Sequence, residues 1–373
     1  MEDSFNHLRQ IKKIALIGTG LIGGSIGLAL KERMLATSLV CYDRDINTAR
    51  EAVARGAADQ AAQSLEEVVH DAELVILAVP VLSTLEILKE IIPYLKDNTL
   101  ITDVGSTKGS IMAAVEQLLP PGTTYIGGHP MTGSEEIGIN GADPGLLENA
   151  IYVITPLPGT DPNLIAKLSA LIERIGAQPL VMEPLSHDRI VALVSHLPHL
   201  MAAVLVQSVA GAGDMELVRT LAAGGFRDST RIVLGNPEIW RDIFISNRWS
   251  LLPALKNFKA SLEQLENALT EPSAETIYEY LNQARDYRRA IPHRGRGILP
   301  DLFEIIVLVR DVPGAIGKLT TLLGEEQINI DAIEILHVRE LSGGSVRFGF
   351  RSEEQQKMAV QLLNSHDYQV FIR

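Results

Sequence analysis

The sequence has little of several features that would point to particular classes of protein. It contains one cysteine, Cys41, which excludes an intrachain disulfide and a cage of several cysteine ligands around a metal. Basic residues number 33 against 46 acidic ones, and the net charge of −13 argues against a nucleic-acid partner. We expect no membrane-spanning run, and the start of the chain (MEDSFNHLRQ) lacks the apolar core of a secretory signal. These absences favour a cytoplasmic location.

What remains is the composition of a globular, multidomain chain. Its 373 residues are 46% hydrophobic and 21% charged, and this length suggests two or three domains. In the first half, short apolar runs alternate with helical patterns, which is typical of βαβ units. We therefore predict a Rossmann-type, doubly wound α/β sheet over residues 1–183. Its expected strands lie at residues 13–17, 39–42, 73–79, 100–104, 124–127, 151–155 and 178–182.

The second half of the chain changes in pattern twice. Residues 184–292 carry apolar residues at helical spacing and predict an all-helical domain, whose apolar faces favour packing across a subunit interface. Two prolines, two glycines and two arginines fall within residues 291–300, which indicates a linker. Residues 299–373 then follow the order β-α-β-β-α-β, which predicts a small ferredoxin-like α+β domain.

A glycine-rich turn, Gly18-Thr-Gly20-Leu-Ile-Gly23, follows the first expected strand and opens a helix. Gly18 permits a tight turn, Gly20 lets a pyrophosphate approach the backbone, and Gly23 allows the helix to pack closely on the strand. Asp43, after the second strand, is placed to bind a ribose, which favours NAD over NADP, although Arg44 could soften that preference. The residues expected at the cofactor are Gly18, Gly20, Leu21, Ile22, Gly23, Asp43, Val79 and Pro80.

Three loops follow strand ends, where open α/β sheets bind their ligands. Val79 and Pro80 form either a wall beside the nicotinamide or a simple strand stop. Ser106 is a candidate catalytic hydroxyl and a candidate N-cap of the next helix, and the two roles could hold together. His129 lies between Gly-Gly and Pro in a fixed loop, where a neutral imidazole could accept a hydroxyl proton as hydride leaves a substrate. A purely structural histidine is the alternative.

The helical half holds the other candidate residues. His196 and His199 lie three residues apart on one helix, but without cysteines or an H-E-x-x-H pattern we expect no metal, and we place them in a cleft beside the cofactor domain. Arg227 and Arg231 form a cation cluster that suits a carboxylate substrate, or else a charged helix end. Trp240 is by default a core residue.

Together these motifs resemble those of the prephenate dehydrogenase family of tyrosine biosynthesis. GTGLIGGS, TDVGSTK, GGHPMTGSE, SHLPH and GGFRDSTRI occur in that family's order over residues 10–290. The later stretch DVPGAIGKLTTLLGEEQINI resembles an ACT regulatory domain. The resemblance implies oxidative decarboxylation of prephenate to 4-hydroxyphenylpyruvate, with NAD as the hydride acceptor, by a homodimer.

The resemblance also implies roles for single residues. His129 serves as the base at the ring hydroxyl, and Ser106 hydrogen-bonds the same region. Arg231 pairs with the ring carboxylate, and Asp188 orients Arg231. Trp240 falls where relatives contribute an aromatic residue from the partner subunit, and Ser134 stands where some relatives have threonine. The further residues expected at the substrate or across the dimer are His196, His199, Glu135 and Arg227.

The ACT resemblance implies an amino-acid site, and we expect feedback inhibition by L-tyrosine. Alternatives are an arogenate dehydrogenase, which differs only in the substrate side chain, tyrosine acting at the active site, and a non-catalytic NAD-sensing regulator. A β-hydroxyacid-type dehydrogenase is disfavoured because that group relies on a helical-domain lysine, and no lysine lies between Lys167 and Lys256. The residues expected at the regulatory site are Asp311, Pro313, Gly314, Ile316, Asn329 and Ile330.

Overall fold

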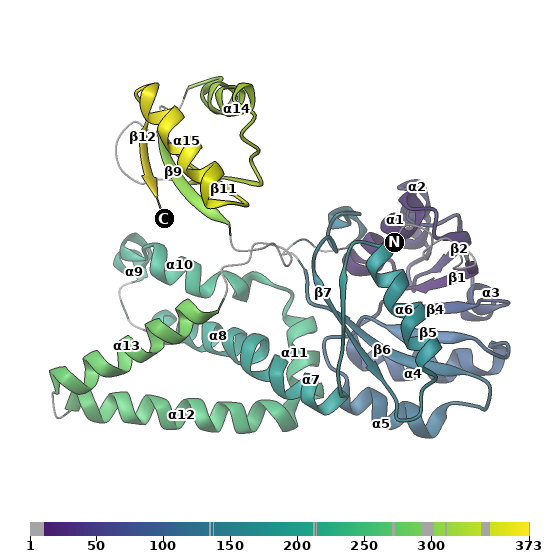
Figure 1. The fold of residues 1–373 in the computed structure, drawn as a ribbon. Helices are drawn as coiled ribbons and strands as arrows, with labels where there is room; N and C mark the ends of the chain where they lie inside the picture. Colours follow the sequence, from purple (N-terminus) through teal and green to yellow (C-terminus); the bar gives the residue numbers. More distant parts are fainter. Residues whose placement is uncertain are drawn as a thin grey trace. The chain divides into compact units, whose positions relative to one another are not determined.

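The computed structural model describes residues 11–291 and 302–372, apart from 134, 135, 137, 212, 214, 271, 272, 310, 311 and 337–343. Its internal contacts divide the chain into two units, and the division falls between Tyr280 and Leu281. The first unit contains a large sheet and a helical region, and the second contains a small sheet (Figure 1). The domain boundaries at 183, 292 and 299 stay predictions.

The large sheet has eight strands in the order β3-β2-β1-β4-β5-β6-β7-β8. Every neighbouring pair is parallel except β6 and β7, which are antiparallel. The central strand β4 is buried at all four positions, as expected for a strand covered on both faces. The strands are β1 Ile11–Ile17, β2 Ala36–Tyr42, β3 Gln60–Ala61, β4 Leu74–Leu77, β5 Leu100–Asp103, β6 Thr124–Pro130, β7 Ile151–Pro156 and β8 Gln178–Val181.

Helices cover both faces of this sheet and close two separate hydrophobic cores. Because side chains alternate along β1, Ile14 and Leu16 join the core under α1, α2 and α6, whereas Ala15 and Ile17 join the core under α3, α4 and α5. The doubly wound fold predicted from the alternating pattern is confirmed. The helices are α1 Leu21–Glu32, α2 Ile46–Ala54, α3 Leu65–Val69, α4 Thr84–Ile91, α5 Gly109–Leu118 and α6 Pro162–Arg174.

The region after β8 is helical, as predicted, and begins with a long interrupted helix. A π-helical turn, η4 (Ala192–His196), joins α7 to α8, and the N–H of Leu197 donates to the carbonyl of Ala192. Pro198 follows directly and has no N–H to donate, which favours such an irregularity. The helices are α7 Pro184–Val191, α8 Leu197–Ala210, α9 Met215–Leu221, α10 Gly224–Thr230, η5 Arg231–Leu234, α11 Pro237–Ser246, α12 Arg248–Thr270 and α13 Ala274–Ala290.

The sequence was expected to contain no run long and apolar enough to span a membrane, and for this region that expectation is wrong. Within Pro184–Ala210, a run of 18 residues has a mean hydropathy of 1.8, which satisfies the length and composition of a membrane-spanning helix. It nevertheless carries four polar side chains that are at most 5% exposed, namely His187, Asp188, His196 and His199. Those side chains meet partners on β6, α5 and α11 or the residue after it, so one side of the stretch packs against the rest of its unit.

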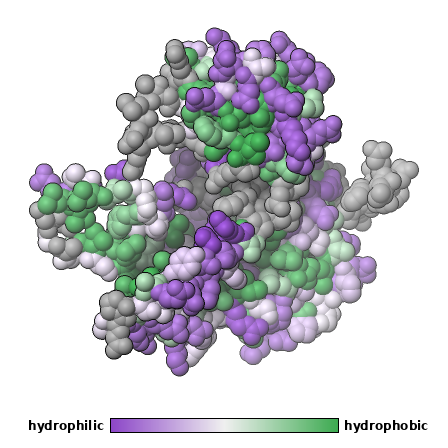
Figure 2. Space-filling model, turned by 60° about the vertical axis from the view of Figure 1, so that its left-hand side comes forward, coloured by the Kyte–Doolittle hydropathy of each residue, from purple (hydrophilic) through white to green (hydrophobic). Residues whose placement is uncertain are grey.

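The second unit contains a four-stranded antiparallel sheet in the order β10-β11-β9-β12, with two helices packed on it. The predicted β-α-β-β-α-β order is confirmed. Apolar side chains also gather on the surface of this unit (Figure 2), and Ile333, Ile335 and Phe371 are about half exposed. The elements are β9 Phe303–Val309, α14 Ala315–Glu325, β10 Ala332–Leu336, β11 Gly344–Phe350, α15 Glu353–Ser365 and β12 Gln369–Ile372.

Candidate active site

The glycine-rich turn after β1 has the geometry needed to hold a dinucleotide. Gly18 has a φ of +91°, and a Cβ there would lie 2.2 Å from the carbonyl oxygen of Ala78. A Cβ on Gly23 would lie 2.0 Å from the carbonyl oxygen of Gly18. No atom of the described residues lies within 4 Å of a Cβ built on Gly20, so the N-terminus of α1 faces open space where a phosphate can approach its N–H groups. The residues present therefore fit the cofactor.

Asp43 lies beside this turn and is held by three hydrogen bonds. Its Oδ2 accepts from the backbone N–H of Thr19 at 2.9 Å and from the Thr19 hydroxyl at 3.1 Å. Its Oδ1 accepts from the N–H of Asp45 at 3.1 Å. A carboxylate fixed here suits ribose hydroxyls and repels a 2′-phosphate. The other residues expected at the cofactor lie in the first turn of α1 or directly after β4: Leu21, Ile22, Val79 and Pro80.

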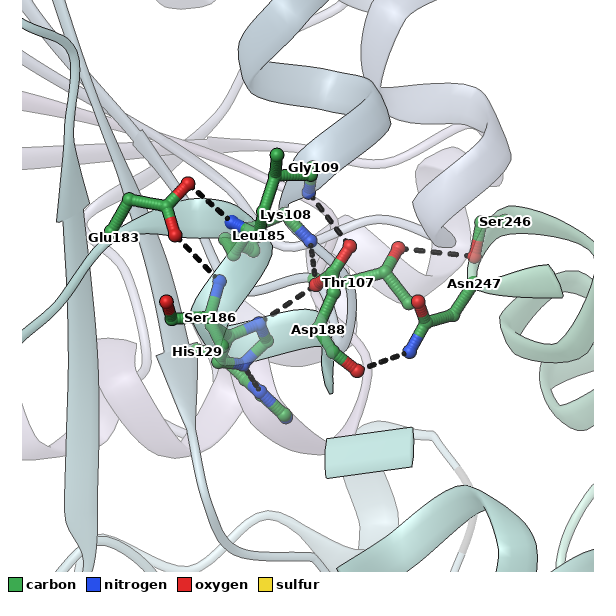
Figure 3. Close-up of polar contacts among 12 residues, drawn as sticks. Thr107, Lys108, Gly109, His129, Glu183, Leu185, Ser186, Asp188, Ser246 and Asn247 are labelled. Atoms are coloured by element: carbon green, nitrogen blue, oxygen red, sulfur yellow. Dashed lines mark hydrogen bonds and ion pairs between the residues drawn. The ribbon is translucent and has the colours of Figure 1, made fainter. Parts of the chain in front are cut away.

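His129 was expected in a loop after its strand, but β6 continues to Pro130 and holds His129 in the ladder opposite Val153. There it belongs to a buried chain of three side chains. Its Nδ1 lies 2.8 Å from Nε2 of His187, and Nδ1 of His187 lies 2.8 Å from Oδ1 of Asp188. The two imidazole rings meet edge to face, with centroids 5.0 Å apart. His129 is 9% exposed, and the other two side chains are more deeply buried. Figure 3 labels His129 and Asp188 and marks the contacts of this group with dashed lines.

The carboxylate of Asp188 also caps a helix of the nucleotide-binding domain. Its Oδ1 accepts from the N–H of Lys108 and its Oδ2 from the N–H of Gly109, both at 2.8 Å (Figure 3). A Cβ on residue 109 would lie 2.9 Å from Oδ2, so glycine allows this approach. The candidate role of Ser106 as the cap of α5 is wrong, because Lys108 occupies the N-cap position and Asp188 supplies the acceptor. The expectation that Asp188 orients Arg231 stays a prediction.

A buried ion pair lies behind His129. The ammonium of Lys108 contacts the carboxylate of Asp103 at the end of β5, and both side chains are fully buried. The same carboxylate accepts from the N–H of Gly105 at 2.9 Å and from the N–H of Gly128 at 3.1 Å. Burial lowers the pKa of Lys108, and the Asp103 charge opposes that shift. The pair therefore ties β5 and the start of α5 to the residue that precedes His129.

The surroundings of His129 favour the neutral imidazole. Burial is the main cause that holds the pKa of His129 well below its usual 6.5, and the neighbouring His187, Lys108 and His196 add to the shift. A neutral imidazole has a lone pair available for a proton, so His129 is equipped to act as a base at physiological pH.

His196 in η4 and His199 in α8 each contact the ring of Trp240. Nδ1 of His196 lies 3.0 Å from the amide nitrogen of Asn247, which also donates to the Asp188 carbonyl. The ring of His199 stacks on Trp240 with centroids 3.6 Å apart. Nδ1 of His199 is buried and has no hydrogen-bond partner within the described part of the chain. Burial lowers the pKa of His196 to about 4 and also lowers that of His199.

The other expected residues are placed less closely together. Ser106 is half buried in the loop before α5, and Arg227 and Arg231 are exposed in α10 and at the start of η5. Trp240, instead of lying in an ordinary core, stacks on a histidine of its own chain. Ser134 and Glu135, expected at the substrate, and Asp311, expected at the regulatory site, lie outside the described residues.

Sequence reasoning assigned no role to three residues that the structure brings into the site: His187, Asn247 and the Asp103 partner of Lys108. One signal was present in the sequence, since a His-Asp pair at the start of an apolar helix is an unusual place for two polar residues. Asn247 gave no such signal, because it follows α11 and reaches the site only through the tertiary fold.

A glycine cradle for phosphates, a fixed acid for the ribose and a buried neutral histidine at the same sheet edge define an NAD-dependent dehydrogenase. Three family models match the chain: the nucleotide-binding domain of prephenate dehydrogenase over residues 26–181, its dimerization domain over 183–283, and the ACT domain over 303–356. The chain belongs to the prephenate dehydrogenase family.

Named relatives agree with this assignment. The chain is 36% identical to the prephenate dehydrogenase of Bacillus subtilis over 361 residues, which cover 96% of this chain and 97% of the relative. It is 31% identical to the cyclohexadienyl dehydrogenase of Zymomonas mobilis, over 75% of this chain and 96% of the relative.

Solved structures show the same likeness. The Aquifex aeolicus prephenate dehydrogenase, solved with hydroxyphenyl propionate and NAD+, has a TM-score of 0.72 and 29% identity over 76% of this chain and its own full length. The Synechocystis arogenate dehydrogenase has a TM-score of 0.66 and 34% identity over 75% of this chain and its own full length.

Proposed function

We propose that the protein oxidatively decarboxylates prephenate to 4-hydroxyphenylpyruvate in cytoplasmic tyrosine biosynthesis. The observation that carries this is the buried, neutral His129 at the edge of the sheet that holds the glycine cradle. Bound NAD would accept the hydride from the ring carbon that bears the hydroxyl. His129 takes the hydroxyl proton as CO2 departs, and the gain of aromaticity drives the step, so the protein supplies chiefly orientation and charge placement.

The other site residues would hold the substrate. Arg231 pairs with the ring carboxylate through its guanidinium fork, and Ser106 hydrogen-bonds near the ring hydroxyl. Nδ1 of His199, which has no hydrogen-bond partner among the described residues, offers a polar contact beside the Trp240 stack, an apolar surface for the ring. His196 completes that wall. We expect Arg231→Ala mainly to raise KM for prephenate, and an unchanged KM would remove the arginine from this role.

The substrate is either prephenate or arogenate, which differ in their side chain, because relatives bear the names prephenate, cyclohexadienyl and arogenate dehydrogenase. Full-length matches to prephenate dehydrogenases favour prephenate. NADH formation is measured on prephenate and on arogenate, and we expect the higher kcat/KM on prephenate. His129→Asn serves as the control and should lower kcat by ~10²–10⁴ on either substrate. A large preference for arogenate would overturn the substrate assignment, and a variant with wild-type turnover would remove His129 from the mechanism.

We further propose that the ACT domain makes the enzyme sensitive to L-tyrosine. Gly314 has a φ of +85° at the N-cap of α14, with Pro313 before it and Ile316 in the first turn. Asn329 and Ile330 precede β10, and the Asn329 amide contacts the Asp331 carboxylate at 3.2 Å. The N-terminus of an eleven-residue helix beside a glycine turn suits an amino-acid carboxylate.

A truncated chain tests this regulation. Relatives whose whole length matches about three-quarters of this chain support the view that the catalytic part can stand without the ACT domain. Deleting residues 297–373 should leave NADH formation on prephenate intact and abolish inhibition by tyrosine. Inhibition that persists, competitive with prephenate, would instead place tyrosine at the active site.

A homodimer is proposed from the helical region. Leu193, Val194, Val204 and Leu205 on η4 and α8 are between 41% and 64% exposed, although they belong to the most apolar helix of that region. Such a face is stabilised when it packs against another copy of itself. Sedimentation equilibrium should give twice the chain mass, and a monomer at micromolar concentration would contradict this.

A further inference from the structure

We propose that His187 is a positioning residue that fixes the tautomer of His129, so that Nε2 of His129 is the atom that accepts the substrate proton. The inference rests on the proposed function for the identity of the reaction. It rests on hydrogen-bond geometry alone for the tautomer, and the two can therefore be tested separately.

The first step concerns Asp188. An ionised carboxylate only accepts hydrogen bonds. Its Oδ1 takes the N–H of Lys108 and its Oδ2 the N–H of Gly109, so both oxygens act as acceptors. The contact at 2.8 Å between Oδ1 and Nδ1 of His187 therefore requires a proton on that nitrogen.

The second step passes along the two rings. A neutral His187 with its proton on Nδ1 presents a lone pair at Nε2. That nitrogen lies 2.8 Å from Nδ1 of His129, so His129 must be the donor there. A neutral His129 with its proton on Nδ1 then has its lone pair at Nε2, the nitrogen on the opposite side of the ring from His187.

The third step concerns the charged state formed in the reaction. The substrate O–H bond breaks, a new N–H bond forms at Nε2, and the ring becomes an imidazolium. The Nδ1–H of that cation still points at His187, whose other side meets the Asp188 carboxylate, so no proton has to move along the chain. Other charged or titratable groups facing His129 are Lys108 with its partner Asp103, and His196.

The rival arrangement is a doubly protonated His187. It would donate to His129, place the His129 proton on Nε2 and leave that nitrogen unable to accept. His187 is 0% exposed, and a buried imidazolium needs compensation. The carboxylate beside it is already shared with two backbone N–H groups, which reduces that compensation.

A matched pair of substitutions separates the two contacts of His187. His187→Gln keeps an amide oxygen near the place of Nε2, where it can accept from His129. His187→Asn keeps an amide nitrogen near the place of Nδ1, where it can donate to Asp188 but cannot reach His129. With comparable thermal unfolding for both, we expect kcat to fall by ~10²-fold or more in the Asn variant and by ~10-fold in the Gln variant, with KM for prephenate little changed. Equal losses in the two variants would overturn the proposal.

The tautomer itself is read without turnover. The wild-type protein, labelled with ¹⁵N in its histidines, is examined by long-range ¹H–¹⁵N correlation, and the His129 signals are assigned by their loss in His129→Asn. We expect Nδ1 at the shift of a protonated nitrogen and Nε2 at that of an unprotonated one. The opposite pattern would refute the inference even in an active enzyme. The expected pattern in a protein inactive on prephenate and arogenate would instead refute the proposed function.

Discussion

Replacing Lys108 by methionine tests how far the buried ion pair with Asp103 supports the nucleotide-binding domain. Methionine fills similar volume without charge, so the variant leaves the carboxylate buried with two backbone donors, Gly105 and Gly128. Removing one partner of a buried pair destabilises by about 3–5 kcal/mol. Because two N–H donors remain, we expect the lower end, about 3 kcal/mol. For a domain of this size that corresponds to a fall in Tm of about 6–12 °C.

Thermal unfolding followed by far-ultraviolet circular dichroism measures the loss. The double variant Asp103→Asn/Lys108→Met is the control, because it removes both charges while an amide oxygen remains for Gly128, and it should recover part of the stability. A single variant within 1 kcal/mol of the wild type would refute the reasoning, and so would a double variant less stable than the single one. The first result would mean that water or a rearranged side chain neutralises Asp103.

The remaining predictions concern the glycine turn and pH. Gly20→Ala places a methyl group in open space and should raise KM for NAD without changing Tm. Gly18 has a φ of +91°, and a Cβ there would lie 2.2 Å from a carbonyl oxygen, so Gly18→Ala should lower Tm. Equal effects of the two substitutions on Tm would contradict the assigned geometry. Since His196 has a folded pKa of about 4 against 6.5, the unfolded chain binds more protons between these values. The free energy of unfolding should therefore fall by about 1.4 kcal/mol per unit as pH drops from 6.5 to 4, and urea titrations of His196→Asn should show a shallower dependence. Because the pKa of His129 is well below 6.5, kcat/KM should stay level as pH falls through 6.5, and a decline centred at or above 6.5 would exclude it as the base.

The fold could be predicted from the sequence because its elements produce short-range patterns of apolar residues and glycines. The buried run at β4, the glycine turn and the β-α-β-β-α-β order depend on neighbours within a few residues. Candidate site residues could be named only where a short motif carries its own signal, as the Gly-Gly-His-Pro stretch does around His129. The contacts of that histidine with His187, 58 residues away, and of Asp188 with Lys108, 80 residues away, depend on how α7 docks.

The register of α7, η4 and α8 is a second feature that could not be predicted. A regular helix through this stretch would not keep His187, Asp188, His196 and His199 on one buried side, whereas the π turn at Ala192–His196 inserts the residue that does. The choice between an α turn and a π turn depends on Pro198 and on tertiary contacts, and hydrophobic spacing does not report it.

The cap that Asp188 places on α5 limits how the two halves of the catalytic unit can move. A hinge motion that separated the sheet domain from the helical region would replace two hydrogen bonds to a carboxylate by bonds to water, at about 1.5–3 kcal/mol each. We therefore expect the sheet domain and the helical region to keep their separation through the catalytic cycle, with ligands entering and leaving by movements of loops. The amide protons of Lys108 and Gly109 should then exchange with solvent as slowly as those of the central strands.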